Sequence, residues 1–317
     1  MKSIKTLVLL GLLVIISVSC DKKDDNGVVA VPVQERGAQY AIDIVKMEDY
    51  LKSHYMTVNA NIDVTVTKIP VGGTQTSIWD QTVYPLQNMI VKNDGRATLF
   101  TDGRIADDVD YKMYYIILNE GGGERPNTID SSFVDYKGWN MENVEIDRTS
   151  TPIWTSFPGA AEFISGFRQM LPKIKTAQSY TVNGDGSINY SNYGNCVVFI
   201  PSGLAYFSNS RVNIPNYANL MFQIKLKALR YNDHDQDKIL TKYELTGTQT
   251  DFFLQDTDGD KIPDFLDIND DGDLYLTKNE LKKPDNSYYQ FNDVPDCSGN
   301  TTNPIRLKKH LDPSCHL

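Results

Sequence analysis

The sequence predicts an α+β protein: an antiparallel sheet with one short helix against it, followed by a loop-rich acidic segment. Three observations carry this prediction. The apolar runs at 113–118 and 197–200 stop at Gly or Pro, as strands do. Apolar residues in 220–226 alternate with period two, which indicates a strand with one buried face. Residues 233–296 hold 17 Asp and Glu against 6 Lys and Arg.

Length and charge bound the functions that the chain can have. With 317 residues, of which 40% are hydrophobic, the chain can bury ordinary cores and should hold about two domains. Its net charge of -10 arises from the acidic segment. Nucleic acid binding needs a basic footprint, so we exclude that class and expect the acidic segment to bind cations.

Residues 1–20 have the composition of a targeting signal. Two lysines precede an apolar run at 7–18, which is too short to span a bilayer, and Cys20 follows a small residue. This order resembles a bacterial lipoprotein signal peptide, although Ser17 stands where that signal usually has Leu. The resemblance implies that Cys20 is lipidated and begins the mature chain. An ordinary secretory signal with an incidental cysteine is the alternative.

The lipid would attach the protein to a membrane of the bacterial envelope. Residues 21–36 are polar or of low complexity and are predicted to form a tether. Within them, 22–25 resemble the acidic export tag of surface lipoproteins in Bacteroidetes. We therefore expect an outer-membrane lipoprotein of a Gram-negative bacterium, and the tag favours the cell surface without fixing the membrane face.

Residues 37–108 form a lead-in region without a chemical constellation. Apolar residues recur at helical spacing from Tyr40 to Leu51, which predicts a helix over 37–55. Alternation in 62–69 predicts a strand, and the Gly and Asn signals that follow predict turns. We expect this region to pack on the domain that follows it.

Motifs dispersed over 111–230 occur together in one known family. They read VDYKG at 134–138, VEID at 144–147, FISGF at 163–167 and IPSGLAY at 200–206, then IP at 214–215 and the alternating strand at 220–226. This order resembles the FKBP-type peptidyl-prolyl cis–trans isomerase domain, which would occupy 109–231. The resemblance implies a sheet wrapped on the short helix at 160–174 and a proline-binding pocket.

Prolyl isomerisation needs no nucleophile, because its barrier is the partial double bond of the amide, about 18–20 kcal/mol. A protein accelerates it by binding the twisted amide better than either planar form. The resemblance implies that Phe167 is the floor under the proline ring and that Asp147 polarises the site or orients Tyr136. The Tyr206 hydroxyl and the Ile164 N–H would hold substrate carbonyls. The remaining substrate-binding residues would be Ile146, Phe163, Ile214 and Phe222.

The sequence departs from the family at three pocket positions. Phe167 stands where the family usually has Trp, Ile146 where it usually has Phe, and Phe207 where it usually has Gly. Residues 181–195 are an insertion rich in Gly, Asn and Tyr, which we expect to form an extra hairpin.

Three functions stay open for this domain. We predict a monomeric isomerase that acts on Xaa-Pro bonds of exported, proline-containing polypeptides. A non-catalytic module of the same fold would bind such segments of a partner without isomerising them. A structural surface lipoprotein would have the pocket filled or disrupted. For each pocket aromatic taken singly, core packing is the alternative to a role in binding.

Residues 232–284 contain three acidic motifs with the spacing of calcium loops. Two of them, 233–244 and 269–280, place ligands at positions 1, 3, 5 and 12, the EF-hand register. Both lack the Gly expected at position 6, where Lys238 and Leu274 stand. The motif between them resembles a thrombospondin type 3 calcium repeat. The predicted Ca²⁺ ligands, which the isomerase chemistry does not need, are Asp233, Asp235, Asp237, Ile239 and Glu244; Asp256, Asp258, Asp260, Asp264 and Asp267; and Asn269, Asp271, Asp273, Tyr275 and Glu280.

Residues 285–317 form a tail with two cysteines. An exported compartment permits a disulfide between Cys297 and Cys315, which would fix the tail. The four histidines form no spacing typical of a metal site.

Overall fold

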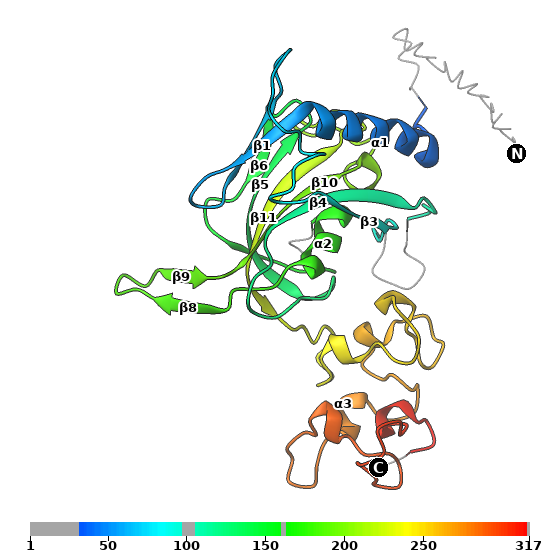
Figure 1. Ribbon diagram of the computed structural model, residues 1–317. Coiled ribbons are helices and arrows are strands. Elements are labelled where there is room, and N and C mark those ends of the chain that lie inside the picture. Colours follow the sequence, from blue (N-terminus) through cyan, green and yellow to red (C-terminus); the bar gives the residue numbers. More distant parts are fainter. Residues whose placement is uncertain (1–31, 97–104, 160–162, 316–317) are drawn as a thin grey trace, which may run out of the picture. The chain divides into compact units, whose positions relative to one another are not determined.

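The computed structural model describes residues 32–96, 105–159 and 163–315 (Figure 1). The predicted signal peptide, Cys20 and most of the predicted tether lie outside the described residues. Gln34–Leu317 form one compact unit. None of the helices in the described ranges is long and apolar enough to cross a bilayer.

The fold is α+β with an antiparallel sheet, as predicted. Seven strands form this sheet in the order β3-β4-β10-β11-β5-β6, with β7 paired to β5, and two hairpins form separate sheets. The strands are β1 (His54–Val58), β2 (Val64–Lys68), β3 (Gln87–Val91), β4 (Tyr111–Asn119), β5 (Ser131–Asn140), β6 (Glu145–Arg148), β7 (Ile153–Thr155), β8 (Ser179–Val182), β9 (Ile188–Ser191), β10 (Gly194–Ile200) and β11 (Leu220–Arg230).

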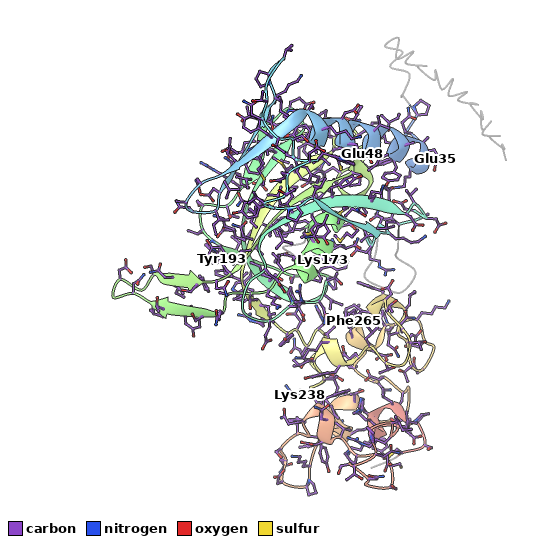
Figure 2. The ribbon with its side chains drawn as sticks, viewed as in Figure 1. Glu35, Glu48, Lys173, Tyr193, Lys238 and Phe265 are labelled. Carbon is purple, nitrogen blue, oxygen red and sulfur yellow. The ribbon has the colours of Figure 1, made fainter. Side chains whose placement is uncertain are left out.

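The helices are few and mostly short. The longest begins after Glu35 (Figure 2), whose carboxylate accepts hydrogen bonds from the N–H groups of Gly37 and Ala38 and so caps the helix. It confirms the predicted helix except that His54 and Tyr55 belong to β1. The helices are α1 (Arg36–Ser53), α2 (Ser165–Met170) and α3 (Thr277–Glu280), with the 3₁₀ turns η1 (Leu171–Lys173), η2 (Ser202–Leu204), η3 (Thr241–Tyr243), η4 (Phe252–Leu254), η5 (Asp264–Leu266), η6 (Phe291–Asp293) and η7 (Lys309–Leu311).

Strand β10 is buried along its whole length because both faces of the sheet are covered. Cys196, Val198 and Ile200 pack in the cluster that contains α2, whereas Val197 and Phe199 pack in the cluster that contains α1. A strand buried on both faces reads as a continuous apolar run, which is why 197–200 does not alternate.

Two buried polar side chains join the lead-in region to the sheet. Asp43 of α1 accepts hydrogen bonds from the N–H and hydroxyl of Ser202, which follows β10. Gln223 of β11 accepts from the N–H of Val64 and donates to the carbonyl of Ile62. The lead-in region also supplies β3, the edge strand paired with β4.

The insertion forms the predicted hairpin. Strands β8 and β9 pair from Ser179 opposite Ser191 to Val182 opposite Ile188 and project away from the large sheet (Figure 1). The ring of Tyr190 lies 6.2 Å from that of Phe133 at the start of β5.

The C-terminal segment has two small apolar clusters. In one, Phe253 and Phe265 pack with Ile129 and Phe157 of the sheet domain. In the other, Ile239 packs with Leu281 and Val294, and aromatic rings of the tail surround them. The fold of this segment therefore depends on its loops and on these two small apolar clusters.

Gly166 lets α2 approach β10 closely. A Cβ at this position would lie 2.4 Å from Cγ2 of Ile200, a buried and branched side chain. We expect Gly166→Ala to destabilise the protein by about 1–3 kcal/mol through overpacking, measured by urea unfolding. Gly184→Ala is the matched control, because its Cβ would meet nothing within 4 Å. Equal stability of the two variants would contradict the close approach.

Candidate functional site

Four aromatic side chains meet between α2 and the sheet. Phe167 of α2 lies at the centre and exposes 0% of its surface. Tyr136 of β5 and Phe222 of β11 face it edge-on, each with its ring centroid 5.5 Å away. The ring of Phe163 lies parallel to Phe167, with centroids 4.3 Å apart. The aromatic pocket residues predicted from the sequence thus form one cluster.

Phe163 covers the predicted floor of the pocket. It stacks on Phe167 at an interplanar angle of 12°, so it covers one face of the ring that is predicted to form the floor under the proline. In this conformation Phe167 exposes none of its surface. An aromatic pair contributes about 0.5–1.5 kcal/mol beyond its buried area, so the stacking stabilises this conformation of Phe163.

Polar groups border the cluster on one side. The Tyr136 hydroxyl donates a hydrogen bond of 2.6 Å to Asp147 of β6. Burial, with the neighbouring Asp147 carboxylate, raises the pKa of Tyr136 well above its usual range, so the hydroxyl stays a donor. Of the two predicted roles for Asp147, the orientation of Tyr136 is the one with a direct contact.

Two further donors fit the predicted contacts to substrate carbonyls. Tyr206 is half-buried, burial raises its pKa, and the Arg211 guanidinium lies 5.4 Å from its ring centre. No described residue hydrogen-bonds the Tyr206 hydroxyl or accepts the Ile164 N–H. Ile146, Ile164 and Ile214 pack against the same cluster.

Phe207 keeps the backbone conformation that favours Gly. Its φ is 50°, in the left-handed region. The ring packs edge-on against Tyr217, and the Arg36 guanidinium lies 4.3 Å above it. These contacts offset the strain of a side chain at this position.

The three acidic motifs fold as loops of one kind. In each loop the carboxylate at position 3 accepts the N–H of position 5, and the carboxylate at position 5 accepts the N–H of position 7. The acceptor–donor pairs are Asp235–Asp237 and Asp237–Ile239, Asp258–Asp260 and Asp260–Ile262, and Asp271–Asp273 and Asp273–Tyr275. The motif 256–267 therefore shares the register of the other two, with Asp256 at position 1 and Asp267 at position 12. The spacing of its acidic residues in the sequence already shows this register.

The backbone of the loops accommodates the missing glycines. Lys238 at position 6 of the first loop has φ 91°, and Lys261 at the same position of the second has φ 81°. Both thus adopt the conformation for which Gly is expected. Leu274 in the third loop does not have a positive φ, whereas Gly272, two residues before it, has φ 67°.

Buried carboxylate oxygens of the first and third loops have no hydrogen-bond donor. Both oxygens of Glu244 and both of Glu280 are in this state, and these residues expose 4% and 1% of their surface. An unpaired buried acceptor is costly, and an ionised one costs more. Further atoms without a donor belong to Asp233, Asp235, Asp237, Asn269 and Asp271. Oxygen ligands at this spacing fit Ca²⁺.

The second loop is more exposed than the other two. Carboxylate oxygens of Asp256, Asp258 and Asp260 lie within 4.8 Å of one another. Asp264 uses both oxygens inside the loop, accepting from the N–H and hydroxyl of Thr257. This closes the loop, and metal binding by Asp264 stays a prediction.

The two tail cysteines are neighbours. Both are free thiols in this structure. Burial raises the pKa of Cys315 to about 12, and its hydrogen bond with the Cys297 thiol adds to the rise. Asp312, three residues before Cys315, lies near enough to Glu280 to raise the pKa of that carboxyl, after burial and the loop carboxylates. The predicted disulfide would therefore form beside the third loop.

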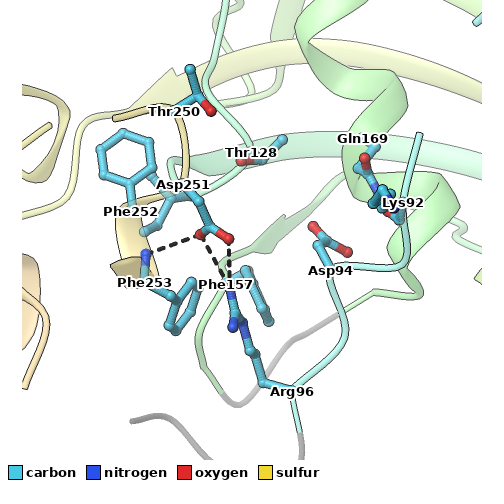
Figure 3. A pocket seen from close by; sticks show the side chains of 11 residues that line it. Lys92, Asp94, Arg96, Thr128, Phe157, Gln169, Thr250, Asp251, Phe252 and Phe253 are labelled. Atoms are coloured by element: carbon cyan, nitrogen blue, oxygen red, sulfur yellow. Dashed lines mark hydrogen bonds and ion pairs between the residues drawn. The ribbon is translucent and has the colours of Figure 1, made fainter. Parts of the chain in front are cut away.

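A cavity of about 260 Å³ lies where the C-terminal segment meets the sheet domain (Figure 3). Arg96 donates to both oxygens of Asp251 at 3.1 and 3.0 Å, and its guanidinium lies 4.1 Å from the Phe253 ring centre. On the sheet side, Arg168 pairs with Asp94 and lies over Phe157. Since Arg168 follows Phe167, the pocket and the acidic segment are joined through contiguous contacts.

Sequence reasoning named Phe163 as a residue that lines the pocket, but it did not predict that its ring stacks on Phe167, a packing outcome that the motif does not encode. It missed Asp270. Asp270 is 2% exposed although position 2 of a calcium loop usually faces solvent. No pattern in the sequence distinguishes it from the other acidic residues.

Comparisons with known families give one sequence match. The family model described as BamM C-terminal matches residues 230–304, which include all three loops. No curated protein matches the chain.

Three of the solved structures similar to this chain have TM-scores of 0.30 to 0.34. FkpA from Escherichia coli is 25% identical with a TM-score of 0.30, over 37% of this chain and 48% of that protein. A peptidyl-prolyl cis–trans isomerase from Pseudomonas syringae is 21% identical with a TM-score of 0.30, over 42% and 79%. A multi-domain immunophilin from Arabidopsis thaliana is 16% identical with a TM-score of 0.34, over 43% and 50%. The chain thus spans about half the length of FkpA.

Burial raises the pKa of the loop carboxyls, to about 6 for Asp267, about 7 for Asp237 and about 8 for Asp235 and Glu280. A raised folded-state pKa gives stability that is fully present below the unfolded value and is lost as the pH rises through the folded value. In chelator, hydrogen exchange of 232–284 should therefore speed up, beyond its intrinsic pH dependence, from about pH 4 to pH 8. Calcium should suppress this change, and a flat corrected profile in chelator would contradict the burial of these carboxyls.

Proposed function

We propose that the sheet domain is a peptidyl-prolyl cis–trans isomerase of the FKBP type, acting on Xaa-Pro bonds of exported proteins. The observation that carries the proposal is the aromatic cluster around Phe167, bordered by the Tyr136–Asp147 hydrogen bond. An apolar site with a few fixed donors suits a twisted amide, because the twist removes the charge separation of the planar form.

The aromatic rings, the two donors and Asp147 would each have a separate role in the reaction. The aromatic faces and edges would hold the proline ring and exclude water from the amide. Tyr206 and the Ile164 N–H would fix carbonyl groups of the peptide, so that rotation occurs about the Xaa-Pro bond alone. Asp147 would act as a positioning residue through Tyr136, which it contacts directly.

The stacked Phe163 favours a second candidate, a binding module. If Phe163 stays on Phe167, proline-containing segments would bind at the rim formed by Tyr206 and Ile164 without isomerisation. This candidate uses the same residues, and only turnover separates it from the enzyme.

A protease-coupled prolyl isomerase assay on Xaa-Pro peptides tests both candidates. We expect acceleration by the wild type and a loss of up to about tenfold in kcat/KM for Tyr206→Phe, the value of one hydrogen bond to a neutral group. Phe163→Val should raise kcat/KM by uncovering the floor. Tyr180→Phe is the matched control, since Tyr180 is exposed on β8.

The outcomes are distinct. Peptide binding without acceleration, in both the wild type and Phe163→Val, would sink the enzyme and leave the binding module. Activity in Phe163→Val alone would identify Phe163 as the barrier to catalysis. No binding and no acceleration by any folded variant would remove both candidates.

We infer that the C-terminal segment binds Ca²⁺ through its three loops. The buried oxygens without donors on Glu244 and Glu280 support this, because a cation would replace the missing partners. The bound ions would hold the segment's many like charges together, and they would take no part in the isomerisation itself. The match of 230–304 to a family model supports a defined unit in this part of the chain.

We further propose that the protein is lipid-anchored at Cys20 in the envelope of a Gram-negative bacterium and that Cys297 and Cys315 form a disulfide. Mass spectrometry of protease fragments from the membrane fraction tests both. We expect a diacylglyceryl-modified Cys20 as the first residue, and a tail peptide pair that separates only on reduction. An unmodified Cys20, or tail thiols that alkylate without reduction, would contradict the respective part.

A further inference from the structure

Arg211 places a cationic side chain beside the pocket, and the isomerase motifs do not account for it. Its guanidinium lies 5.4 Å from the ring centre of Tyr206, the residue expected to hold a substrate carbonyl. Tyr206 is half-buried and Arg211 is exposed, so the charge lies at the solvent-exposed edge of the cluster. A group that binds at Tyr206 would therefore meet this charge.

A short antiparallel bridge fixes the backbone that carries Arg211. The N–H of Arg211 donates to the carbonyl of Ile214 at 2.8 Å, and the N–H of Ile214 donates back at 3.0 Å. Asn213, inside this turn, has φ 59°, and its carbonyl accepts a hydrogen bond of 3.1 Å from Asn140 of β5. Ile214 is 6% exposed and packs in the apolar cluster around Phe167. The turn is thus anchored in the pocket, and the position of Arg211 follows from it.

Arg211 has no carboxylate partner among the described residues. Its Nη1 atom donates to the carbonyl of Ser210 at 3.3 Å, and the other described contact of its side chain is the Tyr206 ring. Asp147, the acidic residue of the pocket, instead accepts the hydrogen bond of the Tyr136 hydroxyl. No ion pair within the described part of the chain therefore balances the charge of Arg211.

The neighbouring arginines differ from Arg211 in this respect. Three of them line a cavity of about 270 Å³ beside Tyr206 and Ile164, and the described lining of this cavity contains no acidic residue. Each of the three forms an ion pair with a carboxylate that does not line the cavity. The charges of these arginines are thus balanced within the protein, whereas that of Arg211 is available to a ligand. The three pairs are Arg36–Asp107, Arg96–Asp251 and Arg168–Asp94, at 2.8, 3.0 and 2.7 Å.

We propose that Arg211 is a specificity-determining residue that binds the carboxylate of an acidic residue flanking the proline of the substrate. The inference rests on the proposed peptide site around Phe167 and names the class of peptide that this site takes. The Tyr206 hydroxyl would hold a backbone carbonyl, and a Glu or Asp side chain next to the proline would reach the guanidinium beside it. The planar guanidinium suits this ligand because it can donate two parallel hydrogen bonds to one carboxylate.

The test compares peptides that differ in one side chain, with the mature full-length chain. Four peptides carry Glu or Gln immediately before or immediately after the proline. A protease-coupled assay measures isomerisation, and fluorescence anisotropy of the labelled peptides measures binding. At one of the two positions we expect the wild type to prefer Glu over Gln by about two- to fivefold in kcat/KM and in Kd, the value of an exposed ion pair. The preference should shrink in about 0.5 M salt, because screening is stronger there.

Variants of Arg211 assign the preference to its charge. Arg211→Gln should abolish the preference, Arg211→Lys should retain part of it, and Arg211→Glu should reverse it toward peptides with Lys at that position. The readout is the ratio between paired peptides, so a change in overall activity does not affect it. Arg230→Gln is the matched control, because Arg230 is also exposed and its guanidinium also lies over a ring, 4.7 Å from the centre of Trp154. It should keep the wild-type ratio.

The outcomes separate this inference from the isomerase proposal. A wild type that accelerates isomerisation without preferring Glu, or an Arg211→Gln variant that keeps the preference, overturns the role of Arg211 and leaves the isomerase. Preferential binding of a Glu peptide that Arg211→Gln loses, without acceleration by any variant, supports the role of Arg211 and sinks the enzyme. Neither binding nor acceleration by any folded variant overturns both.

Discussion

The burial of β10 on both faces is the constraint on which the rest of the sheet domain depends. Its odd and even residues belong to different apolar clusters, one under α2 and one under α1. A strand in this position needs a layer on each side, because an exposed face of Val and Phe would not be stable in water. The lead-in region therefore completes the domain: α1 covers one face and β3 extends the sheet edge.

The face of the sheet that α2 covers carries the aromatic cluster and also the ring that covers it. The α2 helix can place Phe167 against Tyr136 and Phe222 only because Gly166 allows close contact with Ile200. Phe163 stacks on the same aromatic surface, on the ring predicted to form the floor of the pocket. The cluster and its cover of Phe163 thus arise from one physical cause, the affinity of aromatic faces for each other in an apolar site.

The acidic segment is stabilised by different interactions from those of the sheet domain. It buries few apolar side chains, so the hydrophobic effect contributes little to its folding free energy. It also buries many carboxylates, whose mutual repulsion opposes folding. Asn and Asp side chains define the loops by bonding to the backbone, and a cation would turn the remaining oxygens from a cost into a stabilising site. The Arg96–Asp251 pair and the ring of Phe253 then connect this segment to α2 through Arg168 and Phe157.

The sequence alone determined the elements and the chemistry that local patterns encode. Alternation in 220–226, the helical spacing of 37–55 and the spacing of Asp233, Asp235, Asp237 and Glu244 depend on neighbours along the chain, and the strand and the helix are confirmed. Tertiary structure decided which side chains are covered by distant ones. The stacking of Phe163 on Phe167 and the burial of Asp270 depend on how separate segments pack, and no local pattern records that packing.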